Sequence, residues 1–147
     1  MSQTVQVSLR QDRDFRFAIH FNENAPPFYG DESPPLGAST GPSPSQLLTA
    51  AVGNCMSDSL LFALRKFKQS PEPIRTEASA VVDRNPQNRL RVQEIRVQIH
   101  LGVPRARLEH LDRALAQFEE FCTVGQSVRQ GIPVHVEVFD SLGERLK

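Results

Sequence analysis

The feature that most constrains the fold is a long helix whose first half is apolar or small on nearly every face. Ser43-Pro44-Ser45-Gln46 places serine at the N-cap, proline at N1 and glutamine at N3, which is the pattern of a capping box. From Gln46 to Lys68 the pattern is helical and predicts a rod about 34 Å long. Its first half reads LLTAAVGNCM, and a helix that is apolar all round is buried all round. We therefore expect a second copy of the chain to help cover it, in a homodimer.

Apolar and polar residues alternate on both sides of this helix and predict two pairs of strands. The alternating segments are residues 5–9, 15–21, 74–82 and 90–101. Turns are expected at Gln11–Asp14 and Asn85–Asn88, and a bulge near Gln93-Glu94 reconciles two phases of apolar residues in the last segment. Residues 22–42 have no periodicity and are expected to be irregular.

Apolar residues recur at spacings of three and four after Pro104 and predict a second helix. They are Leu108, Leu111, Leu115, Phe118 and Cys122, so Cys122 is expected on the core face. Gly131 ends this stretch, and a last strand is expected at Val134, Val136 and Val138. The order ββ-α-ββ-α-β predicts an α+β fold with antiparallel sheets and a long central helix, in a single domain over residues 1–147.

Charge and composition exclude several classes of protein. Seventeen basic and seventeen acidic side chains cancel, and there is no basic tract, so we expect no nucleic acid and no membrane as a partner. The N-terminus lacks the apolar stretch of a signal peptide, and the longest apolar run, Leu47 to Met56, is shorter than the roughly 20 residues of a membrane-spanning helix. Two cysteines without an export signal predict free thiols and a cytoplasmic location.

Metal and cofactor sites are not predicted. The four histidines are scattered one per element, and no histidine or cysteine spacing matches a zinc site. A glycine-rich phosphate loop and a G-x-S-x-G nucleophile turn are both missing from the sequence. We therefore expect no metal and no cofactor.

The two cysteines are the strongest candidates for chemistry. A single buried cysteine is usually a small hydrophobe. Here both cysteines occupy expected core-facing positions, and Cys55 follows Gly53-Asn54, two poor helix formers. Small residues at this point let another backbone or a substrate approach the sulfur.

The sequence around both cysteines resembles the OsmC/Ohr family. The matching residues are Gly41 to Leu48, Ala50-Ala51 and Cys55, which resemble the signature G-P-S-P-x-E-L-L-x-A-A-x-x-x-C, with Asp31-Glu32 and Gly37 before it and Phe121 to Val124 and Ile132 to Val138 in the second half. The resemblance implies an entwined homodimer with two sites at the subunit interface. It also implies thiol-dependent reduction of hydroperoxides, organic ones preferentially in the Ohr branch.

The resemblance assigns roles to individual residues. Cys55 attacks the peroxide and becomes a sulfenic acid, Cys122 resolves it to a disulfide, and an external dithiol reduces the disulfide. Cys55 lies three turns from the helix N-terminus, too deep for the helix dipole to activate it, so a cation must do so. In this family the cation is an arginine, which matches Arg13 best and Arg16 second. Phe28, Phe62 and Phe121 are expected to line a hydrophobic substrate pocket.

One position departs from the family pattern. The peroxidases carry a glutamate nine residues before the first cysteine, where this chain has Gln46. Glutamine completes the capping box, but it forms no salt bridge with the arginine. Positions 46 and 55 lie on opposite faces of the helix and about 13.5 Å apart along its axis, so the family's carboxylate acts across the interface.

Two other functions stay open at this point. The first is an OsmC-like redox-sensing or small-molecule-binding protein without efficient peroxidase turnover, which Gln46 favours. The second is a structural α+β dimer with buried, inert thiols.

Overall fold

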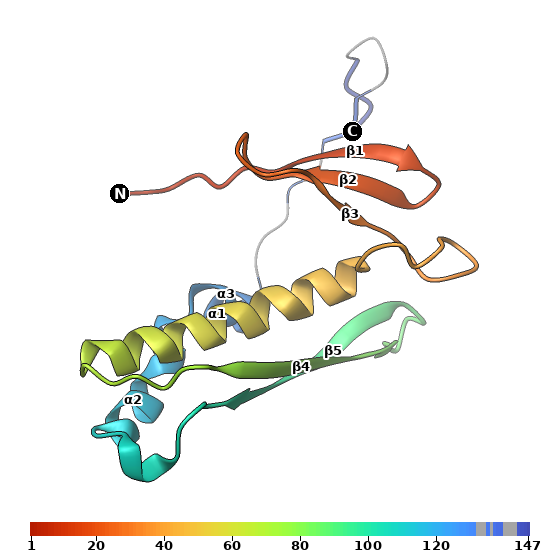
Figure 1. Ribbon diagram of the computed structural model, residues 1–147. Coiled ribbons are helices and arrows are strands. Elements are labelled where there is room, and N and C mark those ends of the chain that lie inside the picture. Colours follow the sequence, from red (N-terminus) through yellow and green to blue (C-terminus); the bar gives the residue numbers. More distant parts are fainter. Residues whose placement is uncertain (132–134, 136, 140–143) are drawn as a thin grey trace.

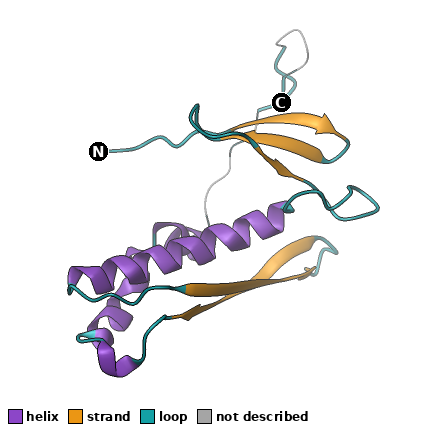
Figure 2. Ribbon diagram, viewed as in Figure 1, coloured by secondary structure: helices purple, strands orange, loops and turns teal. Residues whose placement is uncertain are grey.

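The computed structural model describes residues 1–131, 135, 137–139 and 144–147, and these form two antiparallel sheets around one long helix. The elements up to residue 100 are β1 (Ser8–Arg13), β2 (Arg16–His20), β3 (Phe28–Gly30), α1 (Pro44–Lys66), β4 (Arg75–Arg84) and β5 (Leu90–His100). In Figure 1, α1 lies between the β1-β2-β3 sheet and the β4-β5 sheet. Figure 2 shows the same arrangement by type of element. The predicted α+β fold with antiparallel sheets and a long helix is confirmed.

Helix α1 begins as its sequence predicts. The Ser43 hydroxyl accepts a hydrogen bond from the backbone nitrogen of Gln46, and the Gln46 side chain accepts one from the backbone nitrogen of Ser43. At the other end Arg65 and Lys66 lie in the last turn, where a cation interacts favourably with the helix dipole. The fully buried positions of α1 form one stripe, namely Thr49, Val52, Gly53, Met56, Leu60 and Leu64. Within one chain, therefore, only one face of this apolar helix is covered.

Strands β4 and β5 pair over their whole length and pack against that buried stripe. The register changes between the pairs Val81–Glu94 and Val82–Val92, which leaves Gln93 as the extra residue of a bulge. The predicted bulge is confirmed. Gly53 allows a close approach of α1 to β4, because a Cβ atom there would lie 3.2 Å from the Cβ of Ala78.

The N-terminal sheet differs from the sequence prediction in two details. Its hairpin turn lies at Asp14–Phe15 and not at residues 11–14, because β1 continues to Arg13 and the register shifts between Gln11 and Arg13. Asp14 has a positive φ of 46°, a conformation that aspartate tolerates in tight turns. The short strand β3 lies inside the segment expected to be irregular and pairs with β2.

The predicted second helix is wrong as a single element. The chain forms four short pieces there, η1 (Arg105–Arg107), α2 (Leu111–Gln117), η2 (Phe118–Phe121) and α3 (Thr123–Gln130). His110 has a positive φ of 58° directly before α2, and Cys122 is extended between η2 and α3. As a result Leu115 is exposed, whereas Cys122 is buried as expected.

The end of this region agrees with the prediction only at Gly131, because Val138 of the expected last strand is described and is not in a strand. Gly131 ends α3 with a φ of 73°, which glycine adopts without strain. The expected last strand includes Val134 and Val136, which lie outside the described residues.

Two small clusters form the core between α1 and the elements around it. The first contains Val52, Met56 and Cys122, with Cys55 packed against it. The second contains Leu60, Leu64 and Ala114. Both clusters connect α1 to the segment after β5, and the first of them holds the two cysteines.

Helix α1 is also long and apolar enough to cross a membrane, judged by length and composition alone. The core helix of a soluble protein passes the same test. Its buried stripe and its polar residues Asn54 and Asp58, which are hydrogen-bonded to each other at 2.8 Å, fit a helix that packs inside a protein.

Candidate functional site

The fold brings the two cysteines together although sixty-seven positions separate them. Cys55 lies in the middle of α1, and Cys122 lies between η2 and α3. Cys55 packs against the cluster that contains Cys122, and both thiols are free. Cys122 has no exposed surface, whereas Cys55 is half-buried. Only one thiol of the pair is therefore open to a reagent in this chain.

Cys122 is held in place by the helix that follows it. It is the N-cap of α3, and its Sγ atom accepts a hydrogen bond from the backbone nitrogen of Gly125 at 3.3 Å. A side chain at that position would force a neighbour to move, because a Cβ atom would lie 2.5 Å from Cε of Met56 and 2.9 Å from Sγ of Cys122. The structure thus fits the backbone of α3 directly against the sulfur.

The surroundings of Cys122 disfavour the charged form of its thiol. Burial raises the pKa of the Cys122 thiol, and the adjacent Cys55 raises it further, while the Gly125 amide and the Ser59 hydroxyl lower it. Cys122 therefore stays protonated at neutral pH. Because a thiolate is the reactive form of cysteine, Cys122 is unsuited to react first with a peroxide.

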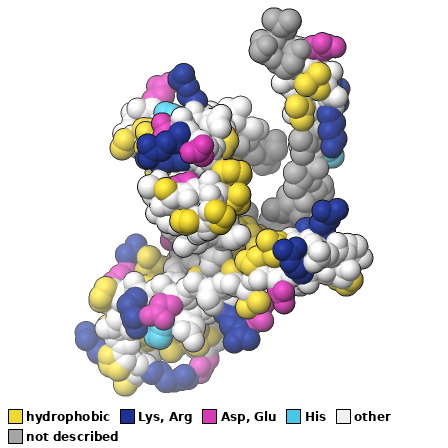
Figure 3. All heavy atoms as spheres, turned by 90° about the vertical axis from the view of Figure 1, so that its right-hand side faces the viewer, with side chains coloured by type: hydrophobic (Ala, Val, Ile, Leu, Met, Phe, Trp, Pro, Cys, Tyr) yellow, Lys and Arg dark blue, Asp and Glu magenta, His cyan; other side chains and the backbone are white. Residues whose placement is uncertain are grey.

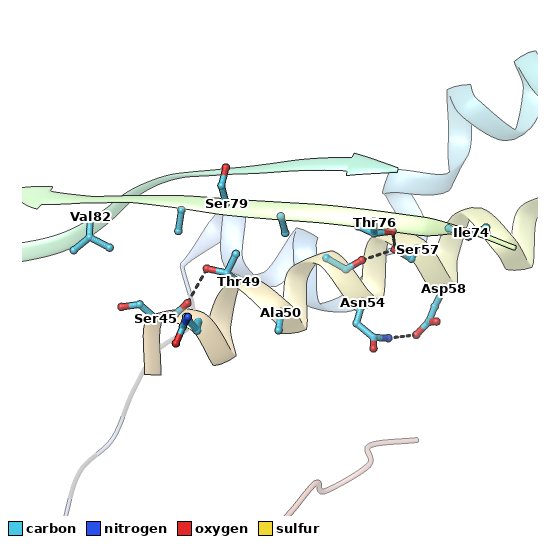
Figure 4. A pocket seen from close by; sticks show the side chains of 14 residues that line it. Ser45, Thr49, Ala50, Asn54, Ser57, Asp58, Ile74, Thr76, Ser79 and Val82 are labelled. Atoms are coloured by element: carbon cyan, nitrogen blue, oxygen red, sulfur yellow. Dashed lines mark hydrogen bonds between the residues drawn. The ribbon is translucent and has the colours of Figure 1, made fainter. Parts of the chain in front are cut away.

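Gln46 lies away from the cysteine pair. Its side-chain oxygen accepts the hydrogen bond from Ser43 described above, and the residue is exposed. It borders a groove of about 740 Å³ between α1 and β4, shown in Figure 4. Small and polar side chains line this groove, including Ser57, which is hydrogen-bonded to Thr76 at 2.6 Å. Neither cysteine borders it.

The two candidate arginines differ in how they are held. Arg13 is an exposed residue at the end of β1. Arg16 starts β2 and forms an ion pair with Asp12, its Nε donates to the Thr40 hydroxyl at 3.0 Å, and its guanidinium lies 3.7 Å from the centre of the Tyr29 ring. The structure therefore holds Arg16 on three sides.

Behind Thr40 lies a buried carboxylate that sequence reasoning did not select as a site residue. Asp31 is 3% exposed and accepts hydrogen bonds from the Thr40 hydroxyl and from the backbone nitrogens of Glu32, Ala38 and Thr40. The bonds from Thr40 lower the pKa of Asp31 to about 2, against the opposing effect of burial. A Cβ atom at Gly37 would lie 2.3 Å from Oδ1 of Asp31. In the sequence, Asp31 and Gly37 stood out only as part of the resemblance to the OsmC/Ohr family.

The three predicted pocket residues do not form a pocket within one chain. Phe28 lies on β3, with its ring 6.0 Å from that of Phe21. Phe62 is 68% exposed on α1, and Phe121 is 71% exposed at the end of η2. None of them borders the 740 Å³ groove or the cavity described next.

A smaller cavity of about 470 Å³ lies near the cysteine pair, although neither cysteine lines it. It lies between α1, β5 and α3, and its lining includes Met56, which shares a core cluster with Cys122, and Gly125, whose backbone nitrogen is hydrogen-bonded to the Cys122 sulfur. Most of the other lining side chains are apolar, namely Leu48, Val52, Val92, Ile95, Val97, Ile99, Phe118 and Val128. Glu119 and Arg129 form a salt bridge of 2.7 Å among its lining residues. This cavity was not predicted from the sequence.

Metal ligands are not grouped in the part of the chain that the structure describes. No three histidine, cysteine, aspartate or glutamate side chains lie close enough there to hold a metal ion. Within these residues, the chemistry available at the site is that of two adjacent thiols beside an apolar cavity.

Comparisons with known proteins agree with this fold. Residues 37–137 match the model of a family described as OsmC-like protein. An OsmC-like protein of unknown function from Vibrio cholerae is 16% identical, with 86% of this chain and 94% of that chain covered and a TM-score of 0.70. The organic hydroperoxide resistance protein OsmC from Legionella pneumophila is 15% identical, with 86% and 90% covered and a TM-score of 0.65.

A further solved structure is also similar. The organic hydroperoxide resistance protein OhrB of Bacillus subtilis is 17% identical, with 86% of this chain and 91% of that chain covered and a TM-score of 0.54. At these identities the solved structures show the shared fold. No curated protein sequence matches the chain.

Proposed function

This chain belongs to the OsmC-like protein family, and on that premise we propose that it is a thiol-dependent peroxidase that reduces organic hydroperoxides through Cys55 and Cys122. The observation that carries the proposal is the contact between a half-buried thiol and a completely buried one. A pair of this kind suits a reaction in which the accessible sulfur attacks the peroxide and the buried sulfur then forms a disulfide with it.

The proposed reaction has three steps. The Cys55 thiolate attacks one peroxide oxygen, the O–O bond breaks, and the alkoxide leaves as an alcohol after taking a proton, so Cys55 becomes a sulfenic acid. Cys122 then attacks the Cys55 sulfur, water leaves, and a disulfide forms. An external dithiol reduces this disulfide to two thiols and becomes a disulfide itself.

The preference for organic hydroperoxides rests on apolar surface near the thiols. The 470 Å³ cavity reaches Met56 and Gly125 and offers apolar side chains to the organic part of a substrate. Phe28, Phe62 and Phe121 are exposed in one chain, so they can line a pocket only where a second copy covers them. We place them at the interface between two copies.

A homodimer is part of the proposal. Helix α1 buries only one stripe within the chain, and Leu48 and Phe62 on it are exposed. The N-terminal sheet also leaves Leu9, Phe17, Phe21 and Phe28 exposed, and hydrophobic side chains are visible at its surface in Figure 3. Apolar area of this kind usually marks an interaction surface.

The remaining partners follow from the same reaction. We propose a hydroperoxide and an external dithiol as the reacting partners, and neither a nucleic acid nor a membrane as a binding partner. We also propose that the protein acts in the cytoplasm, where free thiols persist. The alternative of a redox-sensing or small-molecule-binding protein is less well supported, because two relatives with solved structures are named for organic hydroperoxide resistance. Gln46, which forms no salt bridge with the arginine, is the residue that favours this alternative.

The test is consumption of cumene hydroperoxide in the presence of a dithiol. We expect the wild type to consume the peroxide, Cys55→Ser to be inactive, and Cys122→Ser to accumulate sulfenic or over-oxidised Cys55, seen by peptide mass spectrometry. Modification of Cys122 before Cys55 in the wild type would reverse the two roles. A wild type that forms the disulfide but does not turn over would favour the sensing function.

A further inference from the structure

Three sulfur-containing side chains meet where α1 packs against the start of α3, which lies beside it in Figure 1. Met56 and Cys122 belong to one buried cluster, and Cys55 packs against that cluster. A Cβ atom built at Gly125 would lie 2.5 Å from Cε of Met56 and 2.9 Å from Sγ of Cys122, so both side chains reach the same point. The proposed peroxidase uses the two thiols and gives the Met56 thioether no part in the reaction.

The chemistry of these three ligands distinguishes between metal ions. Thiolates and thioethers are soft ligands, and methionine sulfur in particular favours Cu(I) over harder ions. Zinc at a structural site takes four ligands from cysteine, histidine and carboxylate side chains. Among the residues that the structure describes, not even three of these side chains are grouped. Two cysteines and one methionine therefore suit Cu(I), which accepts fewer ligands than zinc does.

The surroundings of the Cys122 sulfur resemble the outer shell of a metal site. The backbone nitrogen of Gly125 donates a hydrogen bond to this sulfur at 3.3 Å. Such a bond fixes the orientation of a ligating sulfur and stabilises its negative charge. The other side chains packed in this cluster include Val52, Val124 and Val128. An apolar shell of this kind limits the access of water to a bound ion.

The three side chains differ in exposure in a way that gives an ion an entry path. Cys122 has no exposed surface and Met56 is 7% exposed, whereas Cys55 is half-buried. An ion therefore meets Cys55 first and reaches the buried sulfurs from there. The 470 Å³ cavity adjoins Met56, so this flexible, unbranched side chain has space to turn its sulfur toward the thiols.

We propose that Cys55, Cys122 and Met56 form a binding site for Cu(I), with two thiolate ligands and one thioether ligand. On binding, the two thiols release two protons to solvent, three Cu–S bonds form, and the copper stays Cu(I). The site goes beyond the proposed function and does not need it. The two uses of the pair exclude each other in time, because a copper-bound Cys55 sulfur is not free to attack a peroxide.

The first test measures transfer of Cu(I) to the reduced protein without oxygen, from its coloured complex with bathocuproine disulfonate. We expect the wild type to take one Cu(I) per chain, and Cys55→Ser and Cys122→Ser to take none. Met56→Leu keeps the volume of the side chain and removes its sulfur, so we expect Cu(I) binding to weaken about tenfold. Val52→Ala is the matched control, because it disturbs the same cluster without removing a sulfur.

Each result of this titration decides something about the site. A wild type that takes no Cu(I) from the chelator would overturn the proposal. Uptake that persists in both cysteine variants would show adventitious copper on other groups and overturn it as well. Equal affinity in the wild type and Met56→Leu, or equal losses in Met56→Leu and Val52→Ala, would exclude the thioether as a ligand.

The second test is X-ray absorption at the copper edge of the loaded wild type, which does not depend on the folding of any variant. We expect sulfur neighbours alone, three in the wild type and two in Met56→Leu. Nitrogen or oxygen neighbours in the wild type would place the copper elsewhere, and two sulfur neighbours there would exclude Met56.

The last measurement separates this site from the proposed function. Alkylation of Cys55 by iodoacetamide, followed by peptide mass spectrometry, needs no peroxide, and we expect bound Cu(I) to block it until the chelator is added in excess. Unchanged alkylation in the loaded protein would overturn the site. A wild type that binds Cu(I) but consumes no cumene hydroperoxide when copper-free would remove the peroxidase and keep the site. Peroxide consumption without any Cu(I) uptake would do the reverse.

Discussion

The backbone nitrogen of Gly125 donates a hydrogen bond to the sulfur of Cys122 over 3.3 Å. Cys122 is the N-cap of α3, so the sulfur takes the place that a serine or aspartate oxygen often occupies at a helix start. The Gly125 amide holds the buried sulfur in position. The same amide stabilises the Cys122 thiolate when Cys122 is the leaving group in the reduction of a disulfide.

Gly125→Ala is expected to disturb the thiol pair directly. The new methyl group would lie 2.5 Å from Cε of Met56 and 2.9 Å from Sγ of Cys122, so one of them must move. We expect a loss of about 1–3 kcal/mol in the free energy of unfolding, as in other overpacked cores, and slower formation of the disulfide. Urea denaturation and peptide mapping measure the two effects. Gly30→Ala is the control, since its nearest contact would be 3.4 Å; equal losses in both variants would contradict the prediction.

Reduction of the disulfide is expected to begin at Cys55. The half-buried Cys55 sulfur is open to a thiol reagent, and the completely buried Cys122 sulfur is not. Attack on Cys55 breaks the S–S bond and releases Cys122 as a thiolate, which the Gly125 amide stabilises. The protein is oxidised with diamide, treated briefly with 2-mercaptoethanol and quenched with acid before peptide mapping. A mixed disulfide on Cys122 would show that the oxidised site opens differently.

Acid is expected to loosen the loop around Asp31. Hydrogen bonds from Thr40 lower the pKa of Asp31 to about 2, so its contribution to stability is complete at neutral pH and is lost as the pH falls toward that value. The free energy of unfolding should therefore decrease between about pH 4 and about pH 2, and by less in Asp31→Asn. Asp14→Asn, at the exposed hairpin turn, serves as the control. Parallel curves for wild type and Asp31→Asn would disprove the assignment.

Sedimentation at low micromolar concentration is expected to give about twice the chain mass of 16.5 kDa. The reason is the apolar surface that α1 and the N-terminal sheet leave exposed in one chain. Phe62→Glu, on the open face of α1, should weaken the dimer, whereas Leu36→Glu, in the exposed loop before it, should not. A stable folded monomer of the wild type would rule out the dimer and the shared sites with it.

Gln46→Glu is expected to stabilise the protein with little change in peroxidase rate. The first turn of α1 has no acidic residue, and a glutamate there would gain about 0.3–1 kcal/mol from the helix dipole while keeping the capping box. Because Arg16 already has Asp12 and Thr40 as partners, it needs no further carboxylate. Thermal melting and the rate with cumene hydroperoxide measure the two effects. A several-fold gain in rate would mean that the arginine is unrestrained in the wild type.

Local interactions decided the parts of the structure that could be predicted from the sequence. The cap of α1 depends on Ser43 and Gln46, three residues apart, and the bulge at Gln93 follows from the alternation of neighbouring side chains. Both depend on contacts within a few residues, so a pattern in the chain is enough to identify them. The family resemblance lies in the same kind of segment, the capped start of α1 and the residues up to Cys55.

Contacts between distant segments decided the rest. A spacing of three and four predicted one helix after Pro104, but it does not show that His110 turns to a positive φ or that Cys122 leaves the helix to cap the next one. The fixed position of Arg16 depends on Tyr29 and Thr40, which lie 13 and 24 residues away in the sequence and contact its side chain only in the folded structure. By itself the sequence determined which residues can react, because that depends on their chemistry. The tertiary structure decided which of them meet, because burial and hydrogen bonding depend on neighbours that the sequence does not place side by side.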